Sequence, residues 1–368
     1  AEADSLCKLQ LIQNYTNLEN AGPAHYFLFQ VENEADQILQ NIQSETGEKW
    51  NIEEDGLLIT TTLNLMLQNY AARSFHDHLP VMQERLSKQY GLKETEELLQ
   101  AGLLAIDPET GAVKAWVGGI DFKTQPYDQI LARRQLASTF KPILYAEAFE
   151  EGIEPCQYLD NDSIIISGFE DWSPENFDHS FGGRYSLAGA LSQSMNIPTF
   201  NLFLKVDFPK LDSLWGKMGF SFTLNNNPSL ALGTAEASIK EVAAAYSSFA
   251  NGGFKPSLQS IISIKSSDGR EIWQNEFSEV KTRVLTERTS LLISAILQKA
   301  VREGTGTSMK NVFGVTLPLA GKTGTSQSYA AAWFSAFNPK LIIVSRAGAS
   351  FPAVHFNNGS YGSGSALA

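Results

Sequence analysis

The pattern of apolar and polar positions changes near residue 96, and the chain before this point is polar. Gln, Asn and Glu are frequent there, and the one strand-like stretch is GLLITTT at 56–62. A helix is predicted to follow, capped by Thr62 or Asn64 and ended by Pro80. The apolar positions that share one face of this helix are Leu65, Leu67, Tyr70, Ala71, Phe75 and Leu79. We therefore place the main domain boundary near residue 96.

The chain beyond residue 102 begins with strands and continues with helices. LLAID and AVKAWVGG flank the turn signal DPETG and predict a β-hairpin. A helix-rich block is predicted next, with helices at 138–150, 186–195, 199–206 and 238–250. The last of these has well-marked ends, because Ser238 and Glu241 form a capping box and Gly252 and Gly253 close it.

Strands return after residue 253. A hairpin with SSDG at its turn is predicted at 257–275, followed by a helix at 287–303 and two strands around Asn338-Pro339. A hairpin, a helical block and further strands along one chain predict an α+β fold. We expect an antiparallel β-sheet flanked by helices, together with a helical block.

The composition excludes several classes of protein. With 43% hydrophobic and 18% charged residues, the chain has the make-up of an ordinary globular protein rather than a disordered or fibrous one. Its longest apolar run, Tyr329–Phe334, is far shorter than the roughly 18 residues of a transmembrane helix, so the chain as given is expected to be soluble. A net charge of -12 without a basic cluster argues against a nucleic-acid partner.

Neither a metal nor a cofactor is expected. Cys7 and Cys156 are too few and too far apart for a disulfide framework or a zinc site, and they leave open whether they pair. The five histidines lack neighbours at ligand spacing, which favours surface or packing roles for His25, His76, His78, His179 and His355. No P-loop or GxGxxG is present. The start at Ala1 rather than Met predicts a processed or excised fragment, whose membrane anchor would lie outside it.

Three short serine and lysine motifs occur in one order along the chain: STFK at 138–141, SMN at 194–196 and KTG at 322–324. Each is weak alone, since SxxK also begins at Ser5 and Ser278. On a helix Ser138 and Lys141 would share a face, so an unprotonated lysine amine could take the serine proton during attack on a carbonyl. Pro142 belongs in a first helical turn, which places Ser138 at or before the N-cap. The ordinary alternative is that Ser138 only caps the helix.

The other two motifs offer groups that could hold a substrate. Ser194 could relay a proton and Asn196 could bind a substrate amide, although a simple helix C-cap is the alternative. Lys322, Thr323 and Thr325 offer a cation and hydroxyls for a carboxylate, on a strand whose edge is expected to face a cleft. Gly321 and Gly324 would let a substrate backbone approach closely. A solvated strand end is the alternative for KTG.

In this order, SxxK, SxN and KTG resemble the penicillin-recognising serine acyl-transferases, the group that holds penicillin-binding proteins and serine β-lactamases. RRQLASTFKP, WSPENF, PSLALG, AAAYSSFANGG and LAGKTGTS are similar to the transpeptidase domain of class A, bifunctional penicillin-binding proteins. The resemblance covers residues 98–368. Residues 1–97 resemble the linker that precedes this domain in that family, and no sign of the family's glycosyltransferase is found.

The resemblance implies a peptidoglycan DD-transpeptidase that works without a cofactor. Ser138 would be the acylated nucleophile, Lys141 its general base, and Ser194 the proton relay to the leaving amine, assisted by Lys322. Asn196 would bind the amide of the acyl donor. The terminal carboxylate of a D-Ala-D-Ala stem peptide would be held by Lys322, Thr323 and Thr325, with an oxyanion hole formed by the N–H groups of Ser138 and Thr325.

The implied partners are stem peptides and β-lactam antibiotics, and the implied location is the extracytoplasmic face of the bacterial cytoplasmic membrane. Two departures from the family pattern stand out. Leu136 and Ala137 replace a frequent Pro-Gly and are expected to be harmless, whereas YAAAWF at 329–334 lacks the polar and acidic residues usual after KTGT.

Three functions remain open on this fold. They are a DD-transpeptidase, a DD-carboxypeptidase or β-lactamase, and a non-catalytic module that only binds β-lactam or muropeptide. No Glu occurs between Glu175 and Glu236, and Glu236 lacks the ExxLN context, so the deacylating glutamate of class A β-lactamases is missing. A pure binding module should have lost Ser138 or Lys141, and both are present.

Overall fold

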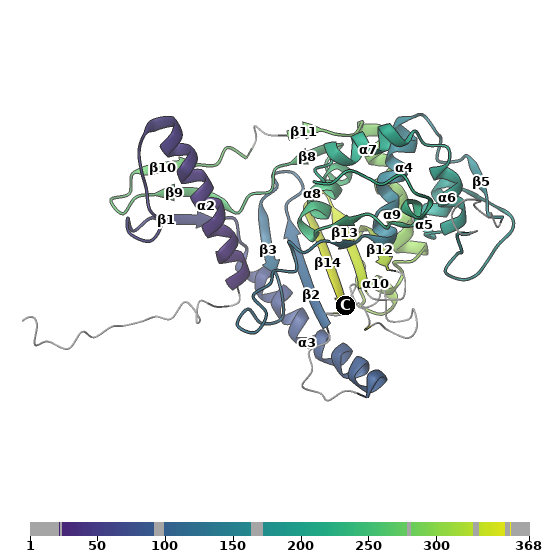
Figure 1. Cartoon of the computed structure of the whole chain (residues 1–368), viewed down its shortest axis with the longest axis horizontal. Helices are drawn as coiled ribbons and strands as arrows, with labels where there is room; N and C mark the ends of the chain where they lie inside the picture. The colour runs from purple at the N-terminus through teal and green to yellow at the C-terminus, as the bar shows by residue number, and fades with distance from the viewer. Residues whose placement is uncertain are drawn as a thin grey trace, which may run out of the picture.

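The computed structural model describes Gly22, Val354 and residues 24–91, 99–162, 172–277, 281–326 and 331–349. A five-stranded antiparallel sheet forms its centre, in the order β12-β13-β14-β2-β3 (Figure 1). The strands are β2 (Leu99–Ile106), β3 (Val113–Val117), β12 (Ala320–Thr325), β13 (Ala331–Asn338) and β14 (Leu341–Ala349). The predicted hairpin at DPETG joins β2 to β3, and the turn at Asn338 joins β13 to β14. The predicted α+β class and both of these hairpins are confirmed.

Alternating side chains of the sheet enter two different apolar layers. Leu104, Trp116 and Trp333 point into the main core, which also contains side chains of α8 (Ile239–Ala250) and α9 (Glu287–Glu303). Leu103 and Ala105 belong to a second cluster on the other face, under α3 (Leu65–Tyr90). The capping box of Ser238 and Glu241 at the start of α8 is present as predicted.

The helical block lies on one side of the sheet (Figure 1). It holds α4 (Lys141–Glu150), α5 (Leu187–Ser192), α6 (Asn196–Phe203), α7 (Phe208–Lys217) and the short turns η2 (Ala137–Thr139) and η3 (Pro228–Leu232). The helix predicted at 199–206 begins earlier, at Asn196, because Pro198 is accommodated in its first turn, where no N–H partner is needed. The helix predicted at 186–195 already ends at Ser192. The connection to α6 is tight, because Ser194 there has a left-handed φ of 57°.

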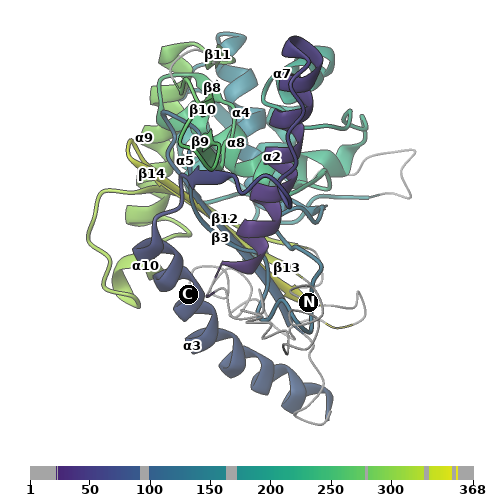
Figure 2. The same ribbon diagram turned by 90° about the vertical axis from the view of Figure 1, so that its left-hand side faces the viewer.

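The N-terminal region contains α2 (His25–Thr46), β1 (Leu58–Thr61) and α3. β1 pairs with β9 (Ile261–Lys265), which also pairs with β10 (Glu271–Gln274), so this small sheet combines segments from both sides of residue 97. Glu34 of α2 accepts hydrogen bonds from the backbone N–H groups of Ser260 and Ile261. Figure 2 shows α2 and α3 as separate helices on this side of the molecule. The proposed division at residue 97 stays a prediction.

The prediction that Pro80 ends α3 is wrong, because the helix continues to Tyr90. The apolar face of the helix packs against Leu99 and Ala101 of the sheet through Leu79, Met82 and Leu86. This tertiary packing outweighs the lost hydrogen bond of an exposed proline. Asn64 caps the helix as predicted, with its side chain accepting from two backbone N–H groups.

The remaining strands form two-stranded ladders around the block. They are β4 (Arg134–Gln135) with β7 (Glu236–Ala237), β5 (Tyr158–Asp160) with β6 (Arg184–Ser186), and β8 (Phe254–Pro256) with β11 (Lys281–Arg283). A short helix, α10 (Ser308–Asn311), precedes β12. None of the helices in the described part of the chain combines the length and apolar character needed to cross a bilayer.

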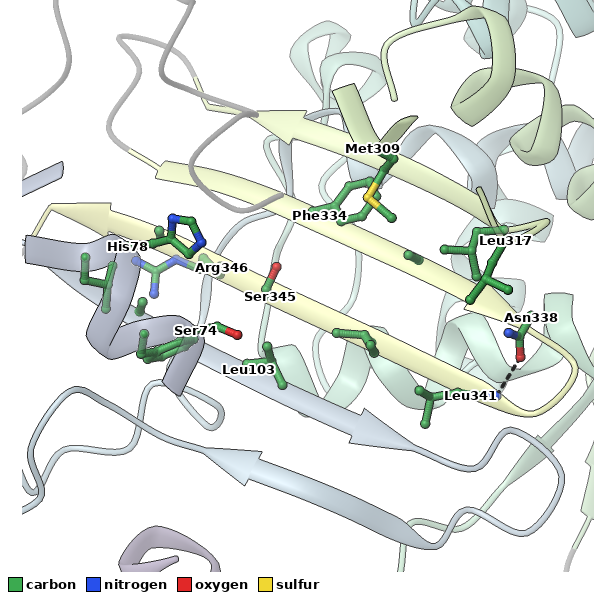
Figure 3. Close-up of a pocket in the computed structure, with 17 residues that line it drawn as sticks. Ser74, His78, Leu103, Met309, Leu317, Phe334, Asn338, Leu341, Ser345 and Arg346 are labelled. Atoms are coloured by element: carbon green, nitrogen blue, oxygen red, sulfur yellow. Dashed lines mark hydrogen bonds between the residues drawn. The ribbon is translucent and has the colours of Figure 1, made fainter. Parts of the chain in front are cut away.

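An apolar cavity of about 310 Å³ lies on the α3 face of the sheet (Figure 3). Its walls come from α3, from the segment around Met309 and Leu317, and from sheet residues that include Leu103 and Phe334. His78 projects from α3 at its rim, and its ring contacts Phe313 edge-on. This histidine therefore packs against an aromatic side chain, in agreement with the sequence interpretation.

Candidate active site

Ser138 occupies the middle of the η2 turn, directly before α4. Phe140 is the N-cap of α4 and Pro142 lies in the first turn, which confirms that the serine precedes the N-cap. Ser138 therefore lies at the amino end of α4, where the helix dipole favours developing negative charge. Ala137 has a left-handed φ of 49°, so the alanine at this position carries backbone strain that a glycine would avoid. The replacement of Pro-Gly, which was expected to be harmless, therefore strains the backbone at Ala137.

Two glycines from distant segments hold this turn between them. Gly233 accepts a hydrogen bond from the Ala137 N–H at 2.9 Å, and a Cβ at this glycine would lie 1.8 Å from the Ala137 carbonyl oxygen. A Cβ at Gly324 would lie 2.9 Å from the Leu136 carbonyl oxygen. Gly324 therefore makes room for the Ser138 turn, and its expected role in letting a substrate backbone approach stays a prediction. Gly321 likewise faces the protein, against Val301 and Phe334.

Replacing Gly233 by alanine is expected to lower both the thermal midpoint and the rate of the acylation expected at Ser138, because the new methyl group would collide with the Ala137 carbonyl. Gly152→Ala is the matched control, since both glycines have a φ of 86° but nothing lies within 4 Å of a Cβ at Gly152. The control separates backbone strain from the collision. Equal thermal midpoints and equal acylation rates in the two variants would contradict this reading of the turn.

Lys141 is completely buried and its amine is surrounded by oxygen atoms of the SMN segment. Nζ lies 2.6 Å from Asn196 Oδ1, 2.7 Å from the Ser194 carbonyl oxygen and 3.2 Å from that of Met195. It also lies 3.4 Å from Ser194 Oγ. SxxK and SxN, more than fifty residues apart in sequence, thus share one hydrogen-bonding cluster.

Lys322 approaches the same serine from β12. Its Nζ donates to Ser194 Oγ at 2.8 Å and to the Thr323 carbonyl oxygen at 2.8 Å, and its side chain is buried. Ser194 Oγ therefore lies between the two lysine amines. The left-handed backbone of Ser194 is what turns the side chain toward them, at the connection between α5 and α6.

Burial lowers the pKa values of both lysines. The pKa of Lys141 is well below that of a free lysine, first because its amine is desolvated and second because the charge of Lys322 is close. Desolvation lowers the pKa of Lys322 to about 7. Loss of solvent is the larger cause of the shift at Lys141, and the neighbouring lysine adds to it. An amine that is partly neutral near neutral pH can act as a base.

The outer edge of β12 offers free backbone groups to the cleft. In an antiparallel pair, hydrogen-bonded and non-hydrogen-bonded residue pairs alternate. Ser326 N–H donates to the Ala331 carbonyl oxygen, so the neighbouring pair of Thr325 and Ala332 is a non-hydrogen-bonded one. The Thr325 N–H consequently points away from β13, as a donor for an oxyanion must. β12 is also an edge strand of the sheet, as the sequence predicted.

The predicted side chains line one cleft. A cavity of about 660 Å³ is bordered by Ser138, Ser194, Asn196, Thr323 and Thr325. A second cavity of about 420 Å³ adjoins it, sharing Ser138, Asn196 and Thr325. Lys141, Lys322 and Gly324 lie beneath this surface, in the contacts given above. The structure thus brings together all eight residues that the sequence singled out, although their roles remain proposals.

Three other residues of the site were given no role in the sequence interpretation, and two of them lie in quoted motifs. Thr305 accepts a hydrogen bond from Thr323 Oγ1 at 2.9 Å and lines the larger cavity. Asn176, from WSPENF, accepts from the Asn196 N–H at 2.7 Å. Gly233 ends PSLALG. Motif similarity marked the last two segments, and only the fold shows what they contact.

No group of three or more His, Cys, Asp or Glu side chains in the described ranges is arranged to hold a metal ion. Cys156 is exposed, whereas Cys7 lies outside the described residues, as do Ser5 and Ser278 of the two other SxxK sequences.

Comparisons with known proteins agree with this geometry. Residues 101–345 match the model of the penicillin binding protein transpeptidase domain. Penicillin-binding protein 1A of Neisseria meningitidis is 34% identical, over 67% of this chain and 32% of the relative. Penicillin-binding protein 1B of Buchnera aphidicola is 31% identical, over 78% of this chain and 37% of the relative.

A solved structure shows the same fold. The PonA1 protein of Mycobacterium tuberculosis, in complex with penicillin V, superposes with a TM-score of 0.69 at 19% identity, covering 90% of this chain and 88% of that one. The chain spans about a third of the length of the curated relatives it matches. Since the family model covers most of the chain and the relatives carry class A names, the chain belongs to the penicillin-binding protein transpeptidase domain family.

Proposed function

We propose that this domain is a serine DD-transpeptidase that cross-links peptidoglycan stem peptides through an acyl-enzyme and is inhibited by β-lactams. The observation that carries the proposal is the hydrogen-bonded row Lys141–Ser194–Lys322, in which both lysines are buried. Ser194 of this row lines the same cavity as Ser138. A nucleophile, a base of lowered pKa and a proton relay in one cleft are the parts that acyl transfer needs.

The proposed reaction has two halves. Ser138 Oγ attacks the carbonyl carbon of the D-Ala-D-Ala bond while its proton passes to Lys141. The C–N bond then breaks, and the leaving D-alanine amine receives a proton through Ser194. In the second half an acceptor amine attacks the ester carbon, forms the cross-link and releases Ser138, which regains its proton.

The residues of the same cleft would also provide the contacts with the substrate. The N–H groups of Ser138 and Thr325 would hold the oxyanion, since the Thr325 N–H is turned away from β13. Asn196 would bind the donor amide, and Lys322, Thr323 and Thr325 would hold the terminal carboxylate. Gly324 would contribute backbone contact and the space that the Ser138 turn occupies.

The proposed substrate also indicates where the domain acts. Peptidoglycan stem peptides lie outside the cytoplasmic membrane, so we place the domain on the extracytoplasmic face of that membrane in bacteria. The name of a solved neighbour, the D,D-transpeptidase domain of a peptidoglycan glycosyltransferase from Eggerthella lenta, supports both the reaction and the substrate. We propose that membrane anchoring and glycan polymerisation belong to other parts of such proteins.

The penicilloyl complex of this domain is expected to persist, because acylation and hydrolysis need different bases. Lys141 can serve acylation, but hydrolysis needs a base that aims a water at the ester. Glu175 borders the cleft, yet its side chain is 76% exposed and lies near His179 at the rim. Chasing labelled protein with excess unlabelled penicillin measures the loss of the label.

The outcomes of that chase separate the candidate functions. A persistent label, together with transfer of a stem-peptide acyl group to an added amine, supports a transpeptidase. Release of free D-alanine without transfer would indicate a carboxypeptidase, and release of the label within seconds would indicate a β-lactamase. Comparison with Glu175→Gln then tells whether the rim carboxylate activates the water.

A further inference from the structure

The start of α6 is capped by a side chain from a distant segment. Met195, the N-cap residue, makes no side-chain cap. Instead, Asn176 Oδ1 accepts from the N–H of Asn196 at 2.7 Å and from that of Ile197 at 3.1 Å. Two of the backbone donors that a helix leaves without partners are thereby satisfied from outside the helix.

The Asn176 side chain is fully engaged. Its Nδ2 donates to Asn161 Oδ1 at 2.7 Å and to the Ser180 carbonyl oxygen at 2.7 Å. Asn176 is 3% exposed and Asn161 is 1% exposed. The Asn161 backbone is itself hydrogen-bonded to the backbones of Gly182 and Gly183. An amide that accepts two and donates two hydrogen bonds in a buried place has one favourable orientation.

The segment that carries this cap also orients the Asn196 side chain. Asn196 Nδ2 donates to the Glu175 carbonyl oxygen at 2.6 Å. A carbonyl oxygen only accepts, so Nδ2 must face Glu175 and Oδ1 must face the Lys141 amine, 2.6 Å away. Residues 175 and 176 therefore fix both the backbone and the side chain of the residue that contacts the proposed base.

We propose that Asn176 is a positioning residue for acyl transfer, which acts through Asn196 on the Lys141 amine. A neutral amine has two N–H groups and one lone pair. The two nearest acceptors, Asn196 Oδ1 and the Ser194 carbonyl oxygen, hold the two N–H groups, so their placement sets the direction of the lone pair. This inference rests on the proposed function, because it assumes that Lys141 is the base for Ser138.

A purely structural cap would predict a different result, and the chain offers a matched control. Asn64 Oδ1 accepts from the N–H groups of Met66 and Leu67 at the start of α3, far from the cleft. Asn176→Ala and Asn64→Ala each remove two helix-capping hydrogen bonds. The two variants are compared by thermal midpoint and by the second-order rate of acylation by a fluorescent penicillin across about pH 5 to 10.

Asn176→Ala is expected to slow acylation roughly ten-fold or more and to shift the acid limb of the pH profile, since misplacing a reacting group by about 1 Å can cost 10²-fold. Asn64→Ala should lower the midpoint but leave the rate and the limb unchanged. Asn176→Asp keeps the acceptor for α6 and should recover part of the rate. If Asn176→Ala fails to fold, Asn161→Ala removes a single partner and should change the rate in the same direction.

A double-mutant cycle tests whether the effect passes through Asn196. Asn176→Ala should slow acylation much less in an Asn196→Ala background than in the wild type. The inference is overturned if the fold-change in acylation rate is equal in both backgrounds. It is also overturned if folded Asn176→Ala has the acylation rate and the acid limb of the wild type. Failure of the wild-type chain to be acylated at Ser138 would instead overturn the proposed function, so the two failures are distinguishable.

Discussion

Replacing Ser138 by alanine is expected to abolish covalent labelling by penicillin, because we propose that the acyl-enzyme ester forms on that hydroxyl. Of the three SxxK sequences, the Ser138 one precedes a helix that begins at Lys141 and lies in a cleft with SxN and KTG. The expected loss is complete rather than partial, since an ester cannot form without the hydroxyl. Mass spectrometry of the labelled wild-type peptide locates the modified residue, and gel fluorescence measures the loss.

Ser5→Ala and Ser278→Ala are the matched controls, since each removes the serine of another SxxK. Both should label at the wild-type rate. The thermal midpoint of Ser138→Ala should stay close to that of the wild type, because a half-buried hydroxyl on a turn contributes little to stability. Label on Ser5 or Ser278, or undiminished label in Ser138→Ala, would refute the assignment of the nucleophile.

Local signals in the sequence predicted most of the central fold. The hairpin at DPETG, the capping box at Ser238 and the helix 287–303 all have short-range causes: a turn residue, a cap or a terminating glycine. The structure places each of these where the sequence indicated. Such features depend on residues within one or two turns of each other, which is why a single sequence can show them.

The errors arose where tertiary contacts outweigh local signals. Pro80 looked like a helix end, but the apolar face of α3 continues beyond it onto the sheet. α2 was not predicted, although Phe27, Val31, Ala35 and Leu39 repeat every four residues and are buried. In a polar region this period was the available signal, and the abundance of Gln, Asn and Glu obscured it.

The candidate site, too, has features that the sequence predicts and features that depend on tertiary contacts. Motif order identified Ser138, Lys141 and Lys322, but nothing in the sequence shows that Ser194 Oγ lies between two lysine amines. The role of Asn176 could not be predicted either, because its partners Asn161 and Asn196 lie fifteen and twenty residues away along the chain. The sequence could not show either that the missing side chain of Gly324 makes room for the Ser138 turn, while its role toward a substrate stays a prediction.

Lys141→Ala is expected to slow acylation by about 10²–10⁴-fold, the usual cost of losing a general base. The hydrogen-bond partners of Lys141 Nζ are amide, carbonyl and hydroxyl oxygens, which are not bases at neutral pH. Lys205→Ala is the control, since Lys205 is an exposed lysine just beyond α6. A Lys141→Ala protein that is labelled at a near-normal rate at neutral pH would show that another group takes the proton from Ser138.

In the proposed mechanism the two lysines act in opposite protonation states, so the wild-type acylation rate should follow a bell-shaped pH profile. Lys141 must be neutral to accept a proton, so the rate should fall as the pH drops through its lowered pKa. Lys322 must be charged to hold a carboxylate, so the rate should fall again above its pKa of about 7. A penicillin methyl ester, which lacks the carboxylate, should keep the acid limb and lose the alkaline one. An alkaline limb that persists with the ester would mean that Lys322 acts on the reacting bond rather than on the carboxylate.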